Sequence, residues 1–180
     1  VEALDQIKPA TGEIVVLSNN INSPSTLAAI HEFVLKYPTT KHIQYEEFSS
    51  YAMIAANEKS FGKALLPAYR FDKANVIVSF GADFLGTWIS PVQFTQQYTA
   101  GRKAIKGMSR HIQFETNLSL TGSNADVRIP ITPSQEGVYL LNLYNKIASA
   151  TGAPALAVSN NEAPLHMIEN TAKELLANQG

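Results

Sequence analysis

Three polar loops are the parts of the sequence whose residue types and spacing suggest binding chemistry. They span residues 18–23, 81–90 and 116–124, and each follows a short apolar run of strand length. In open parallel sheets, ligands bind beyond the carboxyl ends of strands, where backbone N–H groups are available. Asn, Ser, Thr and Gly in such loops suit a nucleotide or a phosphate, although the same residues also build ordinary turns and helix caps.

The second of these loops contains Gly-Ala-Asp-Phe-Leu-Gly at residues 81–86, which lacks the G-x-G-x-x-G spacing of dinucleotide-binding loops. The carboxylate of Asp83 would repel a phosphate dianion, and it is better suited to capping backbone donors or binding a hydroxyl. Phe84, Leu85 and Trp88 are typical of packing groups that fill a cleft. The loop therefore fits either a cofactor corner or a corner that side chains have filled.

The composition excludes several other kinds of site within this segment. The absence of cysteine excludes thiolate metal sites, iron–sulfur ligation, disulfides and cysteine nucleophiles. The net charge is −1, with 14 basic and 15 acidic residues and no long run of either sign, so we expect no nucleic-acid partner. No apolar run approaches the roughly 20 residues needed to span a bilayer, so we expect no direct membrane insertion.

The remaining residues capable of chemistry do not form a recognisable catalytic or metal site. The histidines, which lie on separate predicted elements without metal-ligand spacing, are His31, His42, His111 and His166. Arg110 and His111 with Glu115 suggest either a local polar cluster at a strand start or a structural salt bridge, and the salt bridge is favoured. Glu46-Glu47 is too isolated to predict an acid–base pair. The absence of G-x-S-x-G, P-loop and H-E-x-x-H motifs disfavours a hydrolase, a kinase and a zinc enzyme.

The periodicity of apolar residues predicts short strands that alternate with helices. Strands are expected over residues 13–18, 42–45, 76–80 and 111–115, with a short edge element over 127–131. Helices are expected over residues 24–37, 49–57, 61–69, 91–107, 133–152 and 163–177, two of them starting at Ser-Pro pairs. This alternation is typical of a parallel sheet covered on both faces. We therefore predict a Rossmann-like α/β fold, a three-layer sandwich with a mostly parallel sheet, as a single domain over residues 1–180.

The two ends of the sequence suggest a piece of a longer chain. The chain starts with Val-Glu-Ala, and it stops after a helix that should deliver the chain to another strand. We therefore expect an internal fragment.

Two long stretches carry a family resemblance. They are YRFDKANVIVSFGADFLGTW at residues 69–88 and MSRHIQFETNLSLTGSNAD at residues 108–126. Both resemble the molybdopterin-oxidoreductase-like region of the large iron–sulfur subunit of alternative complex III, the quinol:cytochrome c oxidoreductase of Bacteroidetes-type respiratory chains. Chains of this kind are often labelled iron–sulfur-cluster-containing hydrogenase or molybdopterin oxidoreductase. The resemblance extends more loosely from about residue 12 to the end.

The resemblance implies a domain of the formate dehydrogenase and DMSO reductase type, whose Rossmann-like layer holds the guanine dinucleotide halves of the cofactor. It also implies that a separate ferredoxin-like region of the parent carries iron–sulfur clusters, and that this subfamily keeps the fold without the molybdenum cofactor. Active relatives usually read Gly-x-Asn-Pro and Asp-Pro-Arg-x-Thr where this sequence reads Gly-Ala-Asp-Phe at residues 81–84 and Phe-Glu-Thr-Asn at residues 114–117. Both departures fall on cofactor-contacting positions.

Two hypotheses follow. The first is a non-catalytic scaffold domain, without cofactor or metal in this segment, in a membrane-attached respiratory complex on the periplasmic side of the inner membrane, where it docks other domains and subunits. The second is a domain of an active molybdopterin-dependent oxidoreductase or hydrogenase-like enzyme. In that case the residues expected to bind molybdopterin guanine dinucleotide are Ser18, Asn19, Gly81, Ala82 and Asn117. A stand-alone NAD-binding protein is disfavoured by the glycine spacing.

Overall fold

The computed structural model describes residues 3, 12–47, 49–103, 107–158 and 165–179. The chain divides into two compact units, residues 1–67 and 68–180, and each is described by itself. In the described residues the strands form two small sheets in which every pair is parallel, with helices between the strands. This mixed α/β organisation is compatible with the Rossmann-like fold, and the assignment of residues 1–180 to one domain stays a prediction.

The first unit is built on a single strand–helix–strand motif. Its elements are β1 (Ile14–Ser18), α2 (Pro24–Lys36), β2 (Thr40–Gln44) and α3 (Tyr51–Phe61). β1 and β2 pair in parallel from Ile14 opposite Thr40 to Ser18 opposite Gln44. α2 begins at the predicted Ser-Pro pair, where the hydroxyl of Ser23 accepts a hydrogen bond from the backbone N–H of Thr26.

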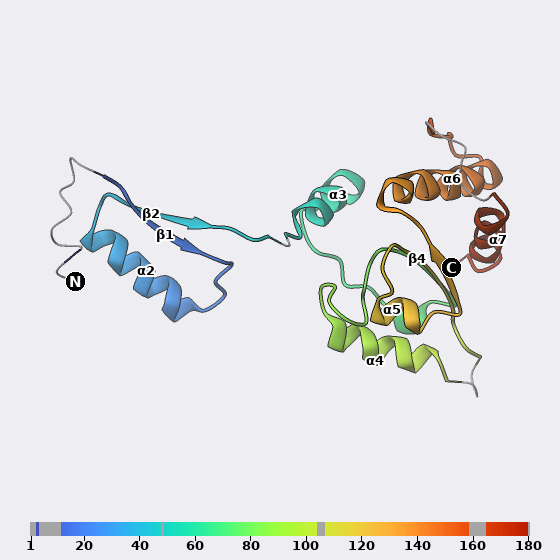
Figure 1. Ribbon diagram of the computed structural model, residues 1–180, viewed down its shortest axis with the longest axis horizontal. Helices are drawn as coiled ribbons and strands as arrows, with labels where there is room; N and C mark the ends of the chain where they lie inside the picture. Colours follow the sequence, from blue (N-terminus) through green and yellow to red (C-terminus); the bar gives the residue numbers. More distant parts are fainter. Residues whose placement is uncertain (1–2, 4–11, 48, 104–106, 159–164, 180) are drawn as a thin grey trace. The chain divides into compact units, whose positions relative to one another are not determined.

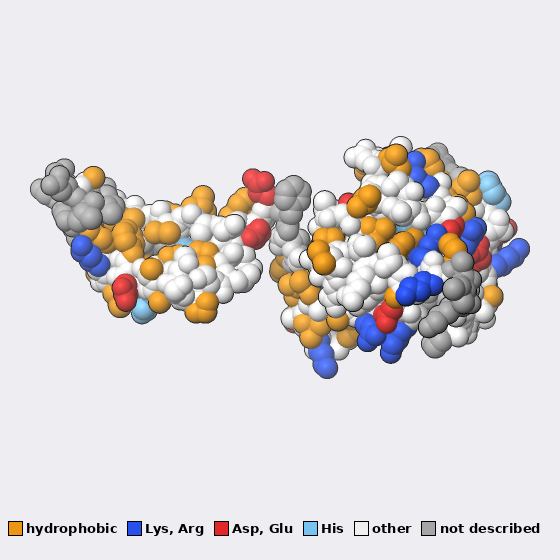
Figure 2. Space-filling view, turned by 90° about the horizontal axis from the view of Figure 1, so that it is seen from below, with side chains coloured by type: hydrophobic (Ala, Val, Ile, Leu, Met, Phe, Trp, Pro, Cys, Tyr) orange, Lys and Arg blue, Asp and Glu red, His pale blue; other side chains and the backbone are white. Residues whose placement is uncertain are grey.

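Among the described residues of the first unit, α2 covers one face of the sheet. Val16 and the α2 residues Ile30 and Phe33 line a shared apolar hollow. Because side chains alternate along a strand, Val15 and Leu17 lie on the other face, and they are 51% and 68% exposed. Hydrophobic side chains are accordingly visible at the surface of this unit (Figure 2). Parallel sheets are normally buried on both faces, so this apolar face is unusual.

The second unit is a three-stranded parallel sheet with helices on both faces (Figure 1). Its elements are η1 (Phe71–Lys73), β3 (Val76–Phe80), α4 (Pro91–Gly101), β4 (Arg110–Glu115), α5 (Leu120–Ser123), β5 (Val127–Pro130), α6 (Pro133–Thr151) and α7 (Leu165–Leu176). The strand order is β3-β4-β5, and Ile112 in the centre lies opposite Val78 on one side and Val127 on the other.

Two apolar clusters hold the helices of the second unit to the two faces of its sheet. The cluster under α6 and α7 includes Ile112, Phe114, Ile129, Ile131, Tyr139, Leu143, Ile168 and Ala172. The cluster under α4 is mostly aromatic and consists of Phe71, Ile77, Phe84, Leu85, Phe94 and Tyr98. β4 lies between these clusters and is therefore buried on both sides. Within the described residues, we find no helix long and apolar enough to cross a membrane.

All five predicted strands are present, but the helix predictions were wrong in three places. The helix predicted over residues 61–69 does not form, because α3 runs from residue 51 to 61 and ends at Gly62 in the left-handed conformation, with φ of 68°. α4 ends at Gly101 instead of near Gly107, consistent with the poor helix propensity of glycine. The loop predicted over residues 116–124 contains the short helix α5.

Two smaller differences concern the ends of elements. β2 begins at Thr40, two residues before its predicted start. α7 is described from Leu165, so the first two residues of the helix predicted over 163–177 lie outside the described residues.

Candidate functional site

The loops after β3 and β4 lie beside each other, because their strands are neighbours. The backbone N–H of Gly81, whose φ is 61°, donates to the carbonyl of Phe114 at 2.8 Å. The carbonyl of Ala82 accepts from the hydroxyl of Ser79 at 3.2 Å, and Asn117 lies exposed just beyond β4. The structure thus places Gly81, Ala82 and Asn117 in adjacent loops of the second unit.

The other two predicted site residues, Ser18 and Asn19, follow β1 in the first unit. The hydroxyl of Ser18 lies 2.9 Å from Nε2 of His42 on the neighbouring strand. The backbone N–H of Asn20, one residue further along, donates to the carboxylate of Glu46 at 2.6 Å. The backbone N–H of Asn20 is therefore already bonded to a carboxylate of the protein itself.

Asp83 joins the loop after β3 to the loop after β4. Its Oδ1 accepts hydrogen bonds from the backbone N–H and the hydroxyl of Thr121, at 3.0 Å and 2.8 Å. The same hydroxyl oxygen accepts from the backbone N–H of Leu85 at 2.9 Å, and Thr121 is fully buried. Asp83 therefore caps backbone donors and binds a hydroxyl, as its position in the sequence suggested.

The three bulky residues of the same loop fill the space under it. Phe84 and Leu85 are buried, and the ring of Phe84 stacks on that of Phe71 with 4.4 Å between centroids. The ring of Trp88 packs against that of Tyr69 at 5.1 Å. The prediction that these residues act as packing groups is confirmed.

A row of polar side chains runs along the face of β4 that points toward α4 and α5. His111 and Gln113 are 0% exposed and Glu115 is 3% exposed. Nε2 of His111 lies 3.3 Å from Oε1 of Gln113, and the amide of Gln113 donates to Glu115 at 3.5 Å. Nδ1 of His111 lies 3.1 Å from the hydroxyl of Tyr98, so each member of the row has a polar neighbour.

The expected salt bridge between Arg110 and Glu115 does not form, because each of these residues pairs with another partner. Arg110 reaches away from the row and pairs with Glu174, with 3.3 Å between Nε and Oε2. Glu115 pairs instead with Arg128 on β5, with 2.5 Å between the two charged groups. Glu115 does form a salt bridge, but its cation comes from the next strand.

Glu115 is the acceptor for the loop that follows its own strand. It accepts from the hydroxyl of Ser119 at 2.6 Å and from the backbone N–H of the same residue at 3.3 Å. Burial alone would raise the pKa of this carboxyl, but the hydrogen bonds from Ser119 and Arg128 outweigh burial and hold its pKa below the ordinary value. A Cβ atom on Gly122 would collide with this carboxylate, so the close approach requires glycine.

A second carboxylate, at the surface, binds the amino-terminal half of β4. The carboxylate of Asp126 accepts from the backbone N–H of His111 at 2.8 Å and from both terminal nitrogens of Arg102, at 2.6 Å and 2.8 Å. The hydrogen bonds from Arg102 hold the pKa of Asp126 below its ordinary value. Burial lowers the pKa of His111, because it removes water from the charged form of the imidazole.

Carboxylates of the protein use backbone donors in two of the three loops that the sequence singled out. In the first loop Glu46 accepts a hydrogen bond from the backbone N–H of Asn20, and in the third loop Glu115 and Asp83 accept from Ser119 and Thr121. The second loop contributes the carboxylate of Asp83 itself. A bound phosphate would need such donors and would lie beside a like charge. Sequence reasoning found this role for Asp83 but missed it for Glu46 and Glu115.

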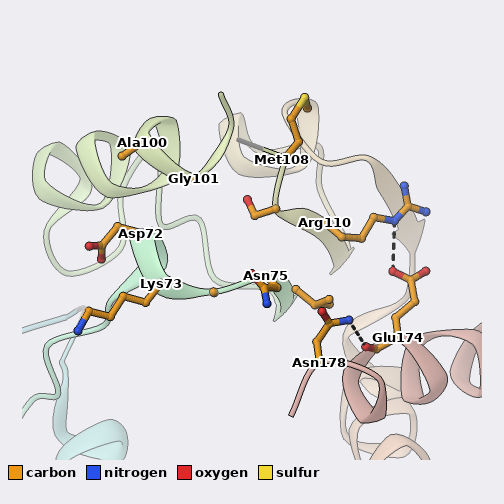
Figure 3. A pocket seen from close by; sticks show the side chains of 13 residues that line it. Asp72, Lys73, Asn75, Ala100, Gly101, Met108, Arg110, Glu174 and Asn178 are labelled. Atoms are coloured by element: carbon orange, nitrogen blue, oxygen red, sulfur yellow. Dashed lines mark hydrogen bonds and ion pairs between the residues drawn. The ribbon is translucent and has the colours of Figure 1, made fainter. Parts of the chain in front are cut away.

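A separate hollow of about 510 Å³ lies at the opposite, amino-terminal end of β3 and β4 (Figure 3). The Arg110–Glu174 ion pair lies at its edge, and Asn178 donates to the carbonyl of Glu174 at 2.9 Å. The hydroxyl of Ser109 is buried here without a hydrogen-bond partner among the described residues.

No family model matches the chain, and a search of curated proteins finds no match. In the described part of the chain, no group of three or more His, Asp or Glu side chains is placed to hold a metal ion.

We predict that Gly122→Ala destabilises the fold by about 1–3 kcal/mol, because the added methyl group would meet a Glu115 carboxylate that several hydrogen bonds hold in place. Urea denaturation monitored by circular dichroism measures the effect. Gly137→Ala is the matched control, since no atom lies near its added Cβ on helix α6, and a stabilisation of about 0.5–1 kcal/mol is expected. Equal stability of the two variants would contradict the contact.

We predict that Asp83→Ala lowers the free energy of unfolding by about 2–3 kcal/mol, because two donors of the buried Thr121 lose a charged acceptor. Asp83→Asn should recover part of this loss, since the amide oxygen can still accept. Asp72→Ala is the control, because its contact with Arg70 is a local surface ion pair, and a much smaller change is expected. A loss after Asp83→Ala no larger than that of the control would show that the link does not hold the loops.

We predict that stability falls as pH drops below about 6.5, the ordinary pKa of histidine, because unfolded His111 binds a proton that the buried side chain resists. A further fall should follow below about pH 4, where Asp126 and Glu115, whose pKa values are lowered by folding, become protonated. Urea denaturation across this range and NMR titration of the His111 imidazole test the expectation. An imidazole that titrates above pH 6.5 in the folded chain would refute it.

Proposed function

We propose that this chain is a non-catalytic scaffold domain of the Rossmann-like, three-layer α/β type. The observation that carries the proposal is that carboxylates of the protein accept hydrogen bonds from backbone N–H groups of the first and third candidate phosphate loops, and that the second loop itself supplies one of these carboxylates, Asp83. The loops keep the positions at which such folds bind dinucleotides, while their hydrogen-bonding groups serve internal contacts.

Electrostatics makes these loops poor sites for a dinucleotide. Two like charges 4 Å apart repel by about 4 kcal/mol at the effective dielectric constant typical of protein surfaces, and each loop presents at least one carboxylate. Gly81 does not relieve this repulsion, because the space beside its Cα is occupied by the carboxylate of Glu136, 3.3 Å from where a Cβ would lie. The compensating cation near Glu115 is Arg128, and that guanidinium is already paired.

The shape of the corner supports the same proposal. Phe84 and Leu85 bury their side chains where a cofactor-binding loop would keep small residues. Asp83 accepts a hydrogen bond from the hydroxyl of Thr121 and so holds the loop after β3 to the loop after β4. Opening it would break charge-assisted hydrogen bonds and expose stacked aromatic rings. These contacts give the corner a structural role.

The setting of the proposed scaffold rests on the family resemblance over residues 69–88 and 108–126. On that basis we place the domain in the large iron–sulfur subunit of an alternative complex III, on the periplasmic side of the inner membrane. Its partners would be other domains and subunits of the complex, and the iron–sulfur clusters would lie elsewhere in the parent subunit. Nucleic-acid binding and direct membrane insertion form no part of the proposal.

We predict that the intact parent subunit, purified from its native complex, contains no stoichiometric molybdenum or pterin by elemental analysis and by fluorescence of the oxidised pterin. Isothermal titration of the present chain with molybdopterin guanine dinucleotide should give no binding heat, because its loop donors are already bonded. Stoichiometric cofactor would overturn the proposal. In that event Gly81→Val, which adds a branched side chain at a left-handed position, would test whether the cofactor uses this loop.

A further inference from the structure

The hydrogen bonds along the polar row of β4 can run in only one direction, because the row ends at a carboxylate. Glu115 is ionised near neutral pH, since its pKa lies below the ordinary value, and an ionised carboxylate can only accept hydrogen bonds. Gln113 therefore turns its NH₂ group toward Oε2 of Glu115, at 3.5 Å. Its carbonyl oxygen Oε1 is left facing Nε2 of His111, at 3.3 Å. A carbonyl oxygen also only accepts, so the proton of the neutral imidazole lies on Nε2.

The other ring nitrogen of His111, Nδ1, is then an acceptor that needs a donor, because a neutral imidazole carries a single proton. The hydroxyl of Tyr98 on α4 lies 3.1 Å from Nδ1. The same hydroxyl lies 2.9 Å from the carbonyl oxygen of Asn124, at the end of α5. One hydroxyl proton thus faces two acceptors, and among the described residues neither acceptor has a second donor.

The two acceptors differ in their access to water. His111 is fully buried, so water does not reach Nδ1. Asn124 is exposed, and water can replace the hydroxyl at its carbonyl oxygen. An acceptor left unpaired in the interior costs more free energy than one at the surface. The hydroxyl of Tyr98 therefore donates to Nδ1 as long as His111 is neutral.

A proton on Nδ1 reverses this arrangement. The imidazolium has two N–H groups, so Nδ1–H donates to the oxygen of Tyr98, and the hydroxyl is free to donate to the carbonyl of Asn124. Each of these polar groups then has a partner. The carboxylates of Asp126 and Glu115 favour the new charge, whereas burial and the guanidinium of Arg102 oppose it.

We propose that the hydroxyl of Tyr98 is a pH-dependent switch, which bonds to neutral His111 near neutral pH and to the carbonyl of Asn124 once His111 is protonated. Burial lowers the pKa of His111, so the change occurs on the acid side of pH 6.5, the ordinary pKa of histidine. Acid then strengthens the contact between α4 and the end of α5, although the fold as a whole becomes less stable. This inference rests on the second unit alone and is independent of the proposed scaffold function.

NMR spectroscopy of the isotope-labelled full chain tests the proposal. Near neutral pH, the ring nitrogens of His111 should show a proton on Nε2 and none on Nδ1. On acidification the Nδ1 resonance should move to that of a protonated nitrogen, and the carbonyl carbon of Asn124 should shift with the same midpoint. In Tyr98→Phe, which removes the hydroxyl alone, the Asn124 resonance should no longer follow His111. The midpoint of His111 should also move to lower pH in this variant, because the imidazolium loses a hydrogen-bond acceptor.

The matched control is Tyr144→Phe, which removes a hydroxyl that bonds to the carbonyl of Pro154 and should leave both responses unchanged. Circular dichroism confirms that each variant is folded. A neutral imidazole of His111 with its proton on Nδ1 would overturn the proposal. So would an Asn124 carbonyl that ignores the titration in the original chain, or that responds equally in Tyr98→Phe. Loss of the fold before His111 takes up a proton would overturn it as well.

Discussion

The second unit depends on one constraint, which is that β4 is buried on both faces although three of its side chains are polar. Burying a polar group without a partner costs several kcal/mol, and burying a lone charge costs more. His111, Gln113 and Glu115 therefore need neighbours that supply hydrogen bonds, and these come from Tyr98, Ser119 and Arg128. The positions of α4, α5 and β5 follow in large part from the need to satisfy this one strand.

The same requirement explains why the loops are poorly matched to a phosphate ligand. A carboxylate that ends a buried strand must find donors, and the nearest ones are the backbone N–H groups of the loop that follows, as Glu115 and Ser119 show. Asp83 repeats the arrangement from the adjacent loop by bonding to Thr121. Internal anions thus use the donors that a dinucleotide would use, and they do so as part of the folded core.

The elements of the fold could be predicted from the sequence because their signals are local. The Ser-Pro pairs at the starts of α2 and α4 and the β-branched run from Val76 to Val78 are signals that depend on neighbouring residues alone. The role of Asp83 was also predictable, since a carboxylate in a loop after a strand needs donors. The acceptors Glu46 and Glu115 were missed, because their importance depends on contacts that only the packed structure defines.

The alternation of polar and apolar residues along β4 agrees with its prediction as a strand but does not show how deeply the strand is buried. Alternation of polar and apolar residues ordinarily indicates a strand with one face in water, yet both faces of β4 are buried. The pairing of Arg110 was likewise unpredictable, because Glu174 lies far along the sequence on α7. The alternating pattern shows which side chains of β4 share a face. Only the packed structure shows which helices cover each face.

The open edge of β3 has a consequence for handling the protein. An unpaired, apolar strand edge can recruit strands from other molecules, and the sequence of β3, Val-Ile-Val-Ser-Phe, has no charge or proline to discourage this. Any version of the chain that leaves this edge uncovered would carry an aggregation-prone segment at its surface.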